Sequence, residues 1–414
     1  HFTWDSCCRN GAITNLVLSS PTSPSEGFTL RASMFPYLDN FGNIVPADPC
    51  FDSSPKFNES PKTIICTGYP FAYSHNASDE ELDVVYYAWD EPLDDFGGAF
   101  NPPLNPAPLP WLAPYTYDNP LPGGVTLDSL TGEIAYNSTI SGNFVTVVRI
   151  DAYKCDQLVA QIYREIQAVL LTCPTLFSGM NNVPPTVPAP FIDPVTGLPS
   201  YSTTVAAGSV INFAISSDDF DIYANGQPQD VSLEITGGQM AGDFITNTDC
   251  INAPCATFTN SAGLLPPLSN PTTVDGYFNW ETACSHVSTS AGCGSISNLY
   301  TFAIKAYDDF CPAPAITLAT ITVEVTAANS LPEPDLQCAF LNGSGDLTLN
   351  WNETFGANSS TIYHILGSDN IGGPYTILAD VFHPDTLYTI DALNIPNGYQ
   401  FFYMTQESAC ANNS

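Results

Sequence analysis

Two sets of acidic side chains have types and spacings that suit metal chemistry. The first set alternates directly ahead of an apolar stretch at 84–89 and contains Asp79, Glu81 and Asp83. The second set occupies a similar turn and the base of a neighbouring strand, and contains Asp218, Asp219, Asp221, Asp308 and Asp309. Clustered carboxylates are the hard oxygen ligands that Ca²⁺ prefers. We expect calcium at these sets, with solvated or hydrogen-bonded turn acids as the alternative, because neither set completes an EF-hand loop.

A long segment rich in Pro, Asn and Gly, residues 90–123, carries a second group of candidate contact residues. Loops of this length are usually functional or mobile. Aromatic rings offer rigid apolar surface to a sugar or a protein partner. The candidates are Phe100, Trp111, Tyr115 and Tyr117. The alternative is that these rings pin the loop to its own domain.

Nothing in the sequence has the spacing of a known catalytic motif. The five histidines do not form HExxH, and neither a GxSxG elbow nor a Walker loop occurs. Paired carboxylates could in principle cleave glycosides, but the acids here fall in turns between short strands. We therefore expect no enzyme and no required cofactor, apart from the calcium considered above.

The 13 cysteines predict an oxidising, extracellular environment. No CxxC spacing indicates zinc. Positions along the chain favour the pairs Cys50–Cys66, Cys250–Cys255, Cys284–Cys311 and Cys338–Cys410, with Cys7 and Cys8 reaching Cys155 and Cys173. Cys293 is then left over, although Cys284 is an alternative partner for it.

The charge balance excludes several classes of partner. Eight Lys and Arg against 42 Asp and Glu give the 414 residues a net charge of −34, so we expect no binding to nucleic acid or to an anionic membrane. Apolar residues make up 44%, enough for folded cores. No apolar run is long enough to span a membrane. We interpret the chain as a processed protein or a segment of a longer secreted one.

Frequent prolines and glycines, together with abundant β-branched and aromatic residues, predict an all-β fold of tandem sandwiches. The boundaries expected are an Ig/cadherin-like sandwich at 1–175, a Pro-containing linker at 176–185, a second such sandwich at 186–328 and a fibronectin type III-like domain at 331–414. The second unit repeats the order of strands and turns of the first. Strands at 144–150 and 158–171 are expected to close the first unit, with the latter as its final edge.

Several short motifs resemble those of a known family. In the first unit these are residues 4–15 (WDSCCRNGAITN), 76–79, 131–134 and 163–167 before Cys173; in the second they are 278–280 before Cys284 and 306–309 before Cys311. In this order they resemble the modules of giant Bacteroidota surface adhesins of the SprB gliding-motility type. The resemblance implies type IX secretion, cell-surface display and a role in adhesion and gliding. Cys155 departs from the pattern, where a small turn residue is expected.

The sequence as a whole predicts a non-enzymatic segment of a secreted cell-surface adhesin, forming a stiff, disulfide-stapled stalk. Its expected partners are neighbouring modules of the same chain and a surface polysaccharide or copies of itself, without insertion into a membrane. One alternative is a subunit of a self-assembling extracellular filament or surface layer. Another is a set of accessory modules of a carbohydrate-active enzyme.

Overall fold

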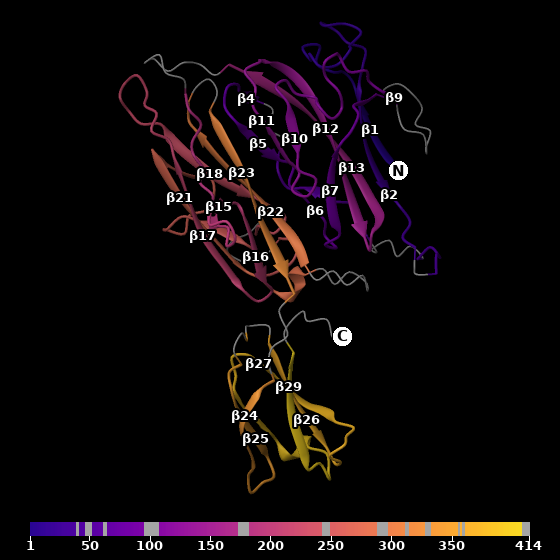
Figure 1. Cartoon of the computed structure of the whole chain (residues 1–414), viewed down its shortest axis with the longest axis vertical. Helices are drawn as coiled ribbons and strands as arrows, with labels where there is room; N and C mark the ends of the chain where they lie inside the picture. The colour runs from indigo at the N-terminus through magenta and orange to yellow at the C-terminus, as the bar shows by residue number, and fades with distance from the viewer. Residues whose placement is uncertain are drawn as a thin grey trace.

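The computed structural model describes residues 1–38, 41–45, 52–60, 64–94, 107–172, 182–241, 249–287, 297–310, 314–327, 333–354, 357 and 361–407. The prediction of an all-β fold is confirmed, because strands dominate and the described helical elements, η1 (Cys284–His286) and η3 (Ala392–Asn394), are single 3-10 turns. In the described ranges no helix is both long and apolar enough to cross a membrane. The strands group into three modules, numbered here in chain order (Figure 1).

Module 1 is built on one large sheet and one small sheet. The large sheet has the order β1-β2-β13-β12-β7, with β4 added parallel to β13; its strands are β1 (Phe2–Ser6), β2 (Phe28–Met34), β4 (Ile64–Cys66), β7 (Val84–Trp89), β12 (Gly142–Lys154) and β13 (Gln157–Leu171). The small sheet has the order β10-β11-β5, with strands β10 (Val125–Leu127), β11 (Glu133–Tyr136) and β5 (Phe71–Ser74). Two short pairs complete the module: β3 (Lys56–Phe57) with β6 (Ala77–Ser78), and β8 (Leu93–Asp94) with β9 (Ala107–Pro108).

The expected hairpin between the last two strands of module 1 is present, but its place in the sheet differs from the prediction. β13 lies between β2 and β12, so it is an interior strand and not the closing edge. β12 is buried without interruption over 144–148 because both of its faces are covered: Phe144 and Val148 pack into the main core, whereas Val145 packs with Leu16 on the other side. A period-2 pattern alone does not reveal such double burial.

Module 2 repeats this design. Its large sheet has the order β16-β23-β22-β18-β20, with strands β16 (Ser202–Ala206), β23 (Ile316–Thr326), β22 (Ser297–Asp308), β18 (Asp230–Thr236) and β20 (Leu268–Pro271). Its second sheet has the order β17-β21-β19, with strands β17 (Val210–Asp218), β21 (Thr273–Glu281) and β19 (Thr257–Thr259); the short pair β14 (Phe191–Ile192) and β15 (Pro199–Ser200) lies beside them. The neighbours β13-β12-β7 of module 1 recur as β23-β22-β18, and β11-β5 recurs as β21-β17.

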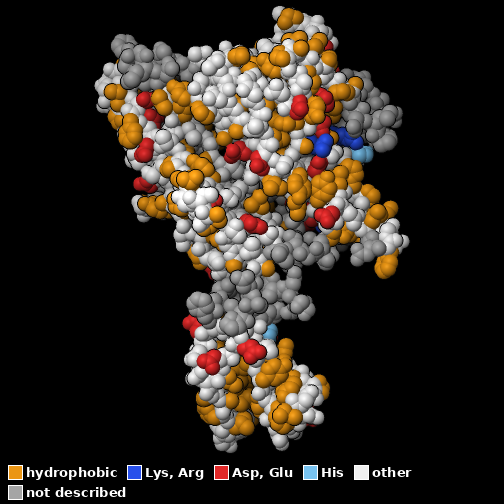
Figure 2. Space-filling model, viewed as in Figure 1, with side chains coloured by type: hydrophobic (Ala, Val, Ile, Leu, Met, Phe, Trp, Pro, Cys, Tyr) orange, Lys and Arg blue, Asp and Glu red, His pale blue; other side chains and the backbone are white. Residues whose placement is uncertain are grey.

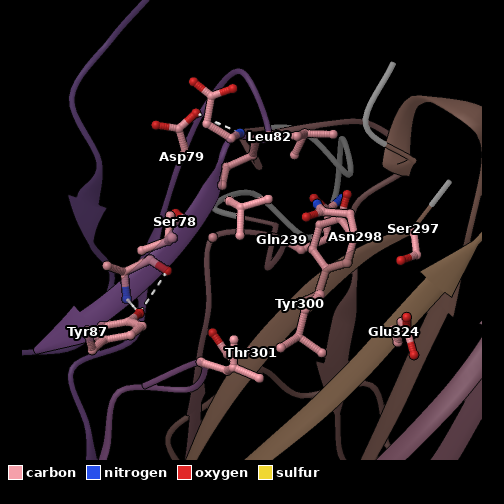
Figure 3. A pocket seen from close by; sticks show the side chains of 18 residues that line it. Ser78, Asp79, Leu82, Tyr87, Gln239, Ser297, Asn298, Tyr300, Thr301 and Glu324 are labelled. Carbon is pink, nitrogen blue, oxygen red and sulfur yellow. Dashed lines mark hydrogen bonds between the residues drawn. The ribbon is translucent and has the colours of Figure 1, made fainter. Parts of the chain in front are cut away.

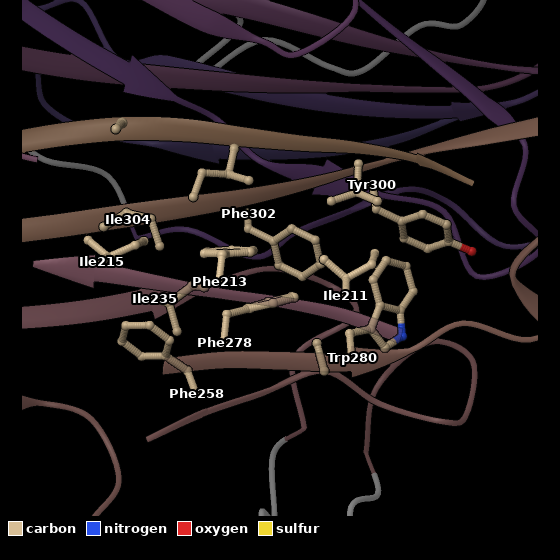
Figure 4. Close-up of a cluster of buried hydrophobic side chains, with 14 of the residues drawn as sticks. Ile211, Phe213, Ile215, Ile235, Phe258, Phe278, Trp280, Tyr300, Phe302 and Ile304 are labelled. Carbon is tan, nitrogen blue, oxygen red and sulfur yellow. The ribbon is translucent and has the colours of Figure 1, made fainter. Parts of the chain in front are cut away.

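Aromatic rings fill the space between the two sheets of module 2 (Figure 4). Phe213 and Phe278 stack with ring centroids 4.5 Å apart, and Phe302 meets Phe278 edge-on at 5.0 Å. Trp280 is fully buried and its indole N–H donates to the carbonyl of Pro254 at 2.9 Å. Alternation along β17 and β21 places these rings on one face of the sheet.

Module 3 is a smaller sandwich of two three-stranded sheets. One sheet has the order β24-β25-β28, with strands β24 (Asp335–Leu341), β25 (Leu347–Asn352) and β28 (Leu387–Ile390). The other has the order β27-β26-β29, with strands β27 (Thr376–Phe382), β26 (Ile362–Ser368) and β29 (Phe401–Glu407). Trp351 and Tyr363 are buried at its centre. This is the fibronectin type III-like arrangement that the sequence predicts.

Modules 1 and 2 lie side by side, while module 3 lies apart from them (Figure 1). Strand β5 contacts strand β23 across the boundary. Leu318 of module 2 belongs to the core of module 1, and Leu82 of module 1 belongs to the core of module 2. The first two modules therefore form one fused body, which we call the head, and not two links of a linear stalk. Acidic side chains are scattered over the face of the head seen in Figure 2.

Candidate functional site

The first acidic set surrounds a buried lysine. Lys154, the last residue of β12, has only 4% of its side chain exposed; its Nζ lies 2.9 Å from Asp52 Oδ1 and 3.1 Å from Asp83 Oδ2. Asp52 and Asp83 are themselves 8% and 0% exposed. The ammonium group of Lys154 therefore supplies a positive charge beside Asp83. Calcium at Asp79, Glu81 and Asp83 stays a prediction.

The other two acids of the first set organise the loop that leads to Asp83. Asp79 Oδ1 accepts hydrogen bonds from the backbone N–H groups of Glu81 (3.0 Å) and Asp83 (3.1 Å). Glu81 Oε2 accepts from the hydroxyl of Ser53 at 2.7 Å. The second carboxylate oxygen of Asp79 is buried and has no hydrogen-bond partner. The loop thus delivers Asp83 to Lys154.

Burial is the largest influence on the pKa values of this cluster. It raises the pKa of Asp79 to about 7, against backbone hydrogen bonds that lower it. Burial, a hydrogen bond with Asp52 and the charge of Asp79 raise the pKa of Asp83 to about 8, despite the opposing effect of Lys154. Burial lowers the pKa of Lys154, but its two carboxyl partners outweigh burial and raise it overall. Burial therefore disfavours the charged form of Asp83, although the ammonium group of Lys154 opposes this effect.

The second acidic set includes a buried chain of polar side chains at one end of module 2. Asp308 Oδ2 accepts from Asn182 Nδ2 at 2.6 Å, and Asn182 Oδ1 accepts from Gln229 Nε2 at 2.9 Å. Burial raises the pKa of Asp308 to about 6, against hydrogen bonds that lower it. Asp219 is buried nearby, and both its Oδ2 and the Oε1 of Gln229 lack a hydrogen-bond partner.

The remaining acids of the second set have ordinary structural partners. Asp218 accepts from the Thr273 hydroxyl at 2.7 Å, and Asp221 accepts from the backbone of residue 183 at 2.8 Å. Asp309 accepts from the backbone N–H of Asp230 at 3.0 Å. Across the described ranges, no group of three or more His, Cys, Asp or Glu side chains is arranged to hold a metal. Calcium at Asp219 and Asp308 stays a prediction.

A cavity of about 410 Å³ opens between modules 1 and 2 (Figure 3). Ser78 and Leu82 line it from module 1, and Gln239 and Tyr300 line it from module 2. Its volume is in the range of small-ligand sites. The Tyr300 hydroxyl, however, already donates to the backbone carbonyl of His286 at 2.8 Å. The cavity is thus a mostly apolar hollow that belongs to the module interface.

The disulfides differ from the expected pattern at the N-terminus. Cys7 bonds to its neighbour Cys8, so neither reaches a distant strand as predicted. Both are exposed, directly after the end of β1. Cys155 is disulfide-bonded all the same, as are Cys66 and Cys284. The predicted partners Cys50, Cys173 and Cys311, and the unassigned Cys293, lie outside the described residues.

Two further cysteine predictions have different outcomes. Cys250 bonds to Cys255, the short-loop pair that the sequence favours. Cys338 carries a free, exposed thiol on β24, which corrects the prediction that it forms a disulfide. Every residue of β24 is exposed, so this strand does not direct Cys338 toward a staple inside the sandwich. Its predicted partner Cys410 lies outside the described residues.

The aromatic residues of the long loop divide into anchored and exposed rings. Trp111 packs beside Leu16, and its indole N–H donates to Glu91 at 2.6 Å. Tyr115 meets the buried ring of Phe144 edge-on at 5.6 Å. These contacts favour the interpretation that Trp111 and Tyr115 pin the loop. Tyr117 is 45% exposed, so among the described candidates its ring is available for contact with a partner. Phe100 lies outside the described residues.

Three of the described histidines, His1, His75 and His286, have structural surroundings. His1 Nδ1 lies 2.6 Å from the Ser33 hydroxyl, but Ser33 is buried and out of reach of a substrate. His75 is fully buried, and burial together with Arg164 lowers its pKa to about 3. His286 is held by backbone partners within module 2. These positions give histidine a packing role.

Sequence reasoning missed the residues that complete both acidic clusters: Asp52, Lys154, Asn182 and Gln229. Lys154 carried one available signal, because it is among only eight Lys and Arg residues of the chain. Asn182 and Asp52 carried none, since each reaches its cluster from a distant segment. Only the fold brings these segments together.

Comparisons with known proteins do not assign the chain to a family. No protein-family model matches it, and no curated protein sequence does. Solved structures similar to it include the chicken CNTN1 FN1-FN3 domains (8% identity, TM-score 0.18, covering 85% of this chain and 91% of that one). A second is Drosophila N-cadherin EC1-4 (11% identity, TM-score 0.21, covering 82% of this chain and 70% of that one). A third is the SrpA adhesin from Streptococcus sanguinis (11% identity, TM-score 0.21, covering 52% of this chain and 94% of that one). At these TM-scores the similarities carry no argument, and the fold assignment rests on the sheets themselves.

Proposed function

We propose that the chain is a non-enzymatic segment of a large secreted adhesin displayed at the cell surface. The observation that carries this proposal is the fused head, in which Leu82 and Leu318 each insert into the core of the other module. Such interdigitation favours a body that keeps its shape under load. The net charge of −34 favours the solubility of such a surface.

The finer part of the proposal concerns the system that the adhesin serves. The motifs at 4–15, 76–79, 131–134 and 163–167 resemble those of gliding-motility adhesins, which supports export by the type IX system and a role in gliding. Tyr117 is the aromatic candidate for contact with a surface polysaccharide, because Trp111 and Tyr115 are committed to anchoring their loop.

Adhesion under flow tests the proposal directly. Beads coated with the chain should be retained on polysaccharide-coated glass in a flow chamber, and Tyr117→Ala should lower retention. Tyr388→Ala is the matched control, because Tyr388 is 39% exposed on module 3. Wild-type beads that wash off as readily as uncoated beads would contradict an adhesive role.

A self-assembling filament is the second candidate, because module 3 presents an unprotected edge. Strand β24 is exposed along its whole length and carries Leu336, Phe340 and Leu341. Exposed apolar edge strands are ready templates for pairing with another chain. Sedimentation at rising concentration separates the two functions: assembly that Phe340→Lys abolishes supports the filament, whereas a monomer at all concentrations supports the adhesin.

A further inference from the structure

Lys154 and its two carboxyl partners are in direct contact inside module 1. The amine nitrogen is 3.1 Å from Asp83 Oδ2 and 2.9 Å from Asp52 Oδ1, and all three side chains are at least nine-tenths buried. These contacts hold the amine beside the Asp83 carboxyl group, and holding two reacting groups together makes their reaction effectively unimolecular. Unlike a surface ion pair, this cluster holds an amine and a carboxyl group together away from solvent.

The backbone fixes this contact. Strand β7 pairs antiparallel with β12, with Val84 opposite Tyr153, so Asp83 and Lys154 follow as the next facing pair. The backbone N–H of Asp83 is also held by Asp79 Oδ1 at 3.1 Å. Asp79 is therefore a positioning residue that limits the freedom of Asp83 relative to the amine.

A buried ion pair explains the cluster poorly. Asp52 and Asp83 place two buried carboxyl groups against one ammonium group, and buried charges are destabilising unless they are fully compensated. Replacing the Lys154–Asp83 contact with a neutral amide would remove two of these charged or titrating groups. The corresponding strand of module 2, β22, ends instead on Asp308, which Asn182 satisfies without a lysine.

We propose that Lys154 and Asp83 become joined by an intramolecular amide, an isopeptide bond, that module 1 forms by itself after folding. Nothing beyond the folded chain is needed, since the nucleophile, the electrophile and a proton acceptor are already in contact. The bond would cross-link the paired ends of β7 and β12 and would add a covalent staple to the disulfides of the head.

The reaction balances with these three side chains. Lys154 passes one ammonium proton to Asp52, the closer carboxylate, and becomes a neutral amine. The amine lone pair attacks Cγ of Asp83. The C–N bond forms and one C–O bond of Asp83 breaks; the departing oxygen takes the proton held by Asp52 and the second amine proton, and leaves as water. No oxidant or cofactor is consumed.

The mass of the intact, reduced and denatured chain tests the proposal without any variant. The chain should be lighter than its sequence by the mass of one water, and digestion should yield one branched peptide that joins Lys154 to Asp83. A wild-type chain of full mass would overturn the proposal. A branched peptide joined through Asp52 would overturn the assignment of roles.

Two variants exclude other sources of water loss. Lys154→Arg keeps a positive charge but cannot form the amide, so it should have the full sequence mass. Lys305→Arg is the matched control, because Lys305 pairs with the partly buried Glu234 in module 2, and it should keep the water loss. Water loss that persists in Lys154→Arg would identify a succinimide elsewhere in the chain and would refute the isopeptide bond.

Discussion

Lys154 is the buried basic partner of Asp83, one of the three acids of the first acidic set. Asp79, Glu81 and Asp83 have the spacing of metal ligands, yet Asp83 pairs with an ammonium group and Asp79 and Glu81 hold backbone and side-chain donors. The second set lacks such a lysine and leaves oxygens of Asp219 and Gln229 without partners. At the residue scale the two modules therefore use similar acids for different purposes.

The pKa of Asp79 predicts a pH dependence of stability. Burial raises this pKa from its ordinary value of 3.8 to about 7, so the folded chain holds a proton that the unfolded chain has already released. The free energy of unfolding should fall as pH rises from about 4 to about 7. Asp79→Asn should remove this contribution, roughly 2–4 kcal/mol, in urea unfolding across that range. Parallel pH profiles for variant and wild type would contradict it.

Calcium binding is predicted for module 2, at Asp219, Gln229, Asn182 and Asp308. Calcium should raise the melting temperature of the chain, and a chelator should reverse the effect, because a ligand that binds only the folded state stabilises it. Asp219→Asn should abolish the shift. Asp218→Asn should preserve it, since Asp218 is satisfied by Thr273. A melting temperature that changes neither with calcium nor with chelator would refute this site.

At the scale of single elements, the residues of a strand reflect the segments that pack on its two faces. β12 is buried on both faces because residues of the N-terminal segment, such as Leu16, cover the face away from the main core. β21 alternates regularly, but Gly276 on it lies directly beneath the Phe258 ring, where an added Cβ would come within 2.0 Å of the ring. Position 276 therefore requires glycine, because the Phe258 ring leaves no room for a side chain.

Gly276→Ala should therefore destabilise module 2. A methyl group under the Phe258 ring overpacks the core, and overpacking typically costs about 1–3 kcal/mol. Calorimetry should record a lower melting temperature for module 2. Gly343→Ala is the control, because no atom lies within 4 Å of the added Cβ and its melting should be unchanged. Equal effects of the two substitutions would refute the packing argument.

At the scale of the whole molecule, the close approach of modules 1 and 2 defines the head. Gly238 of module 2 lies against Ser78 of module 1, and a Cβ on Gly238 would come within 2.4 Å of the Ser78 hydroxyl oxygen. Asn76 bridges the same boundary, donating to Thr236 at 3.2 Å and accepting from Thr301 at 3.0 Å. A bulky side chain at Gly238 is incompatible with this approach.

Gly238→Val should open the head, and the added Cβ would also come within 2.4 Å of Ile251 in module 2. The branched side chain would collide with Ser78, so the modules should separate and the radius of gyration measured by X-ray scattering should rise. Val210→Ala, at an exposed position of β17, should leave the scattering curve unchanged. An unchanged radius for Gly238→Val would show that the interface tolerates the extra volume.

The sequence by itself determined the fold class, the tandem repeat and the fibronectin type III-like third module, because period-2 alternation and turn residues are local properties. It also placed the acids of both clusters in turns next to strands. Local patterns do not encode which distant segment covers a strand face, so the interior position of β13 and the double burial of β12 came only from the tertiary structure.

Tertiary structure also decided the chemistry of both clusters and the arrangement of the modules. Asp52 and Lys154 are 102 residues apart, and Asn182 and Asp308 are 126 apart, so no spacing rule links them. The head depends on single side chains crossing between modules, such as Leu82 and Leu318, each of which looks in sequence like any other buried leucine. The physical reason is common to all these cases: pairing through space depends on the packing of whole sheets, which no short stretch of sequence contains.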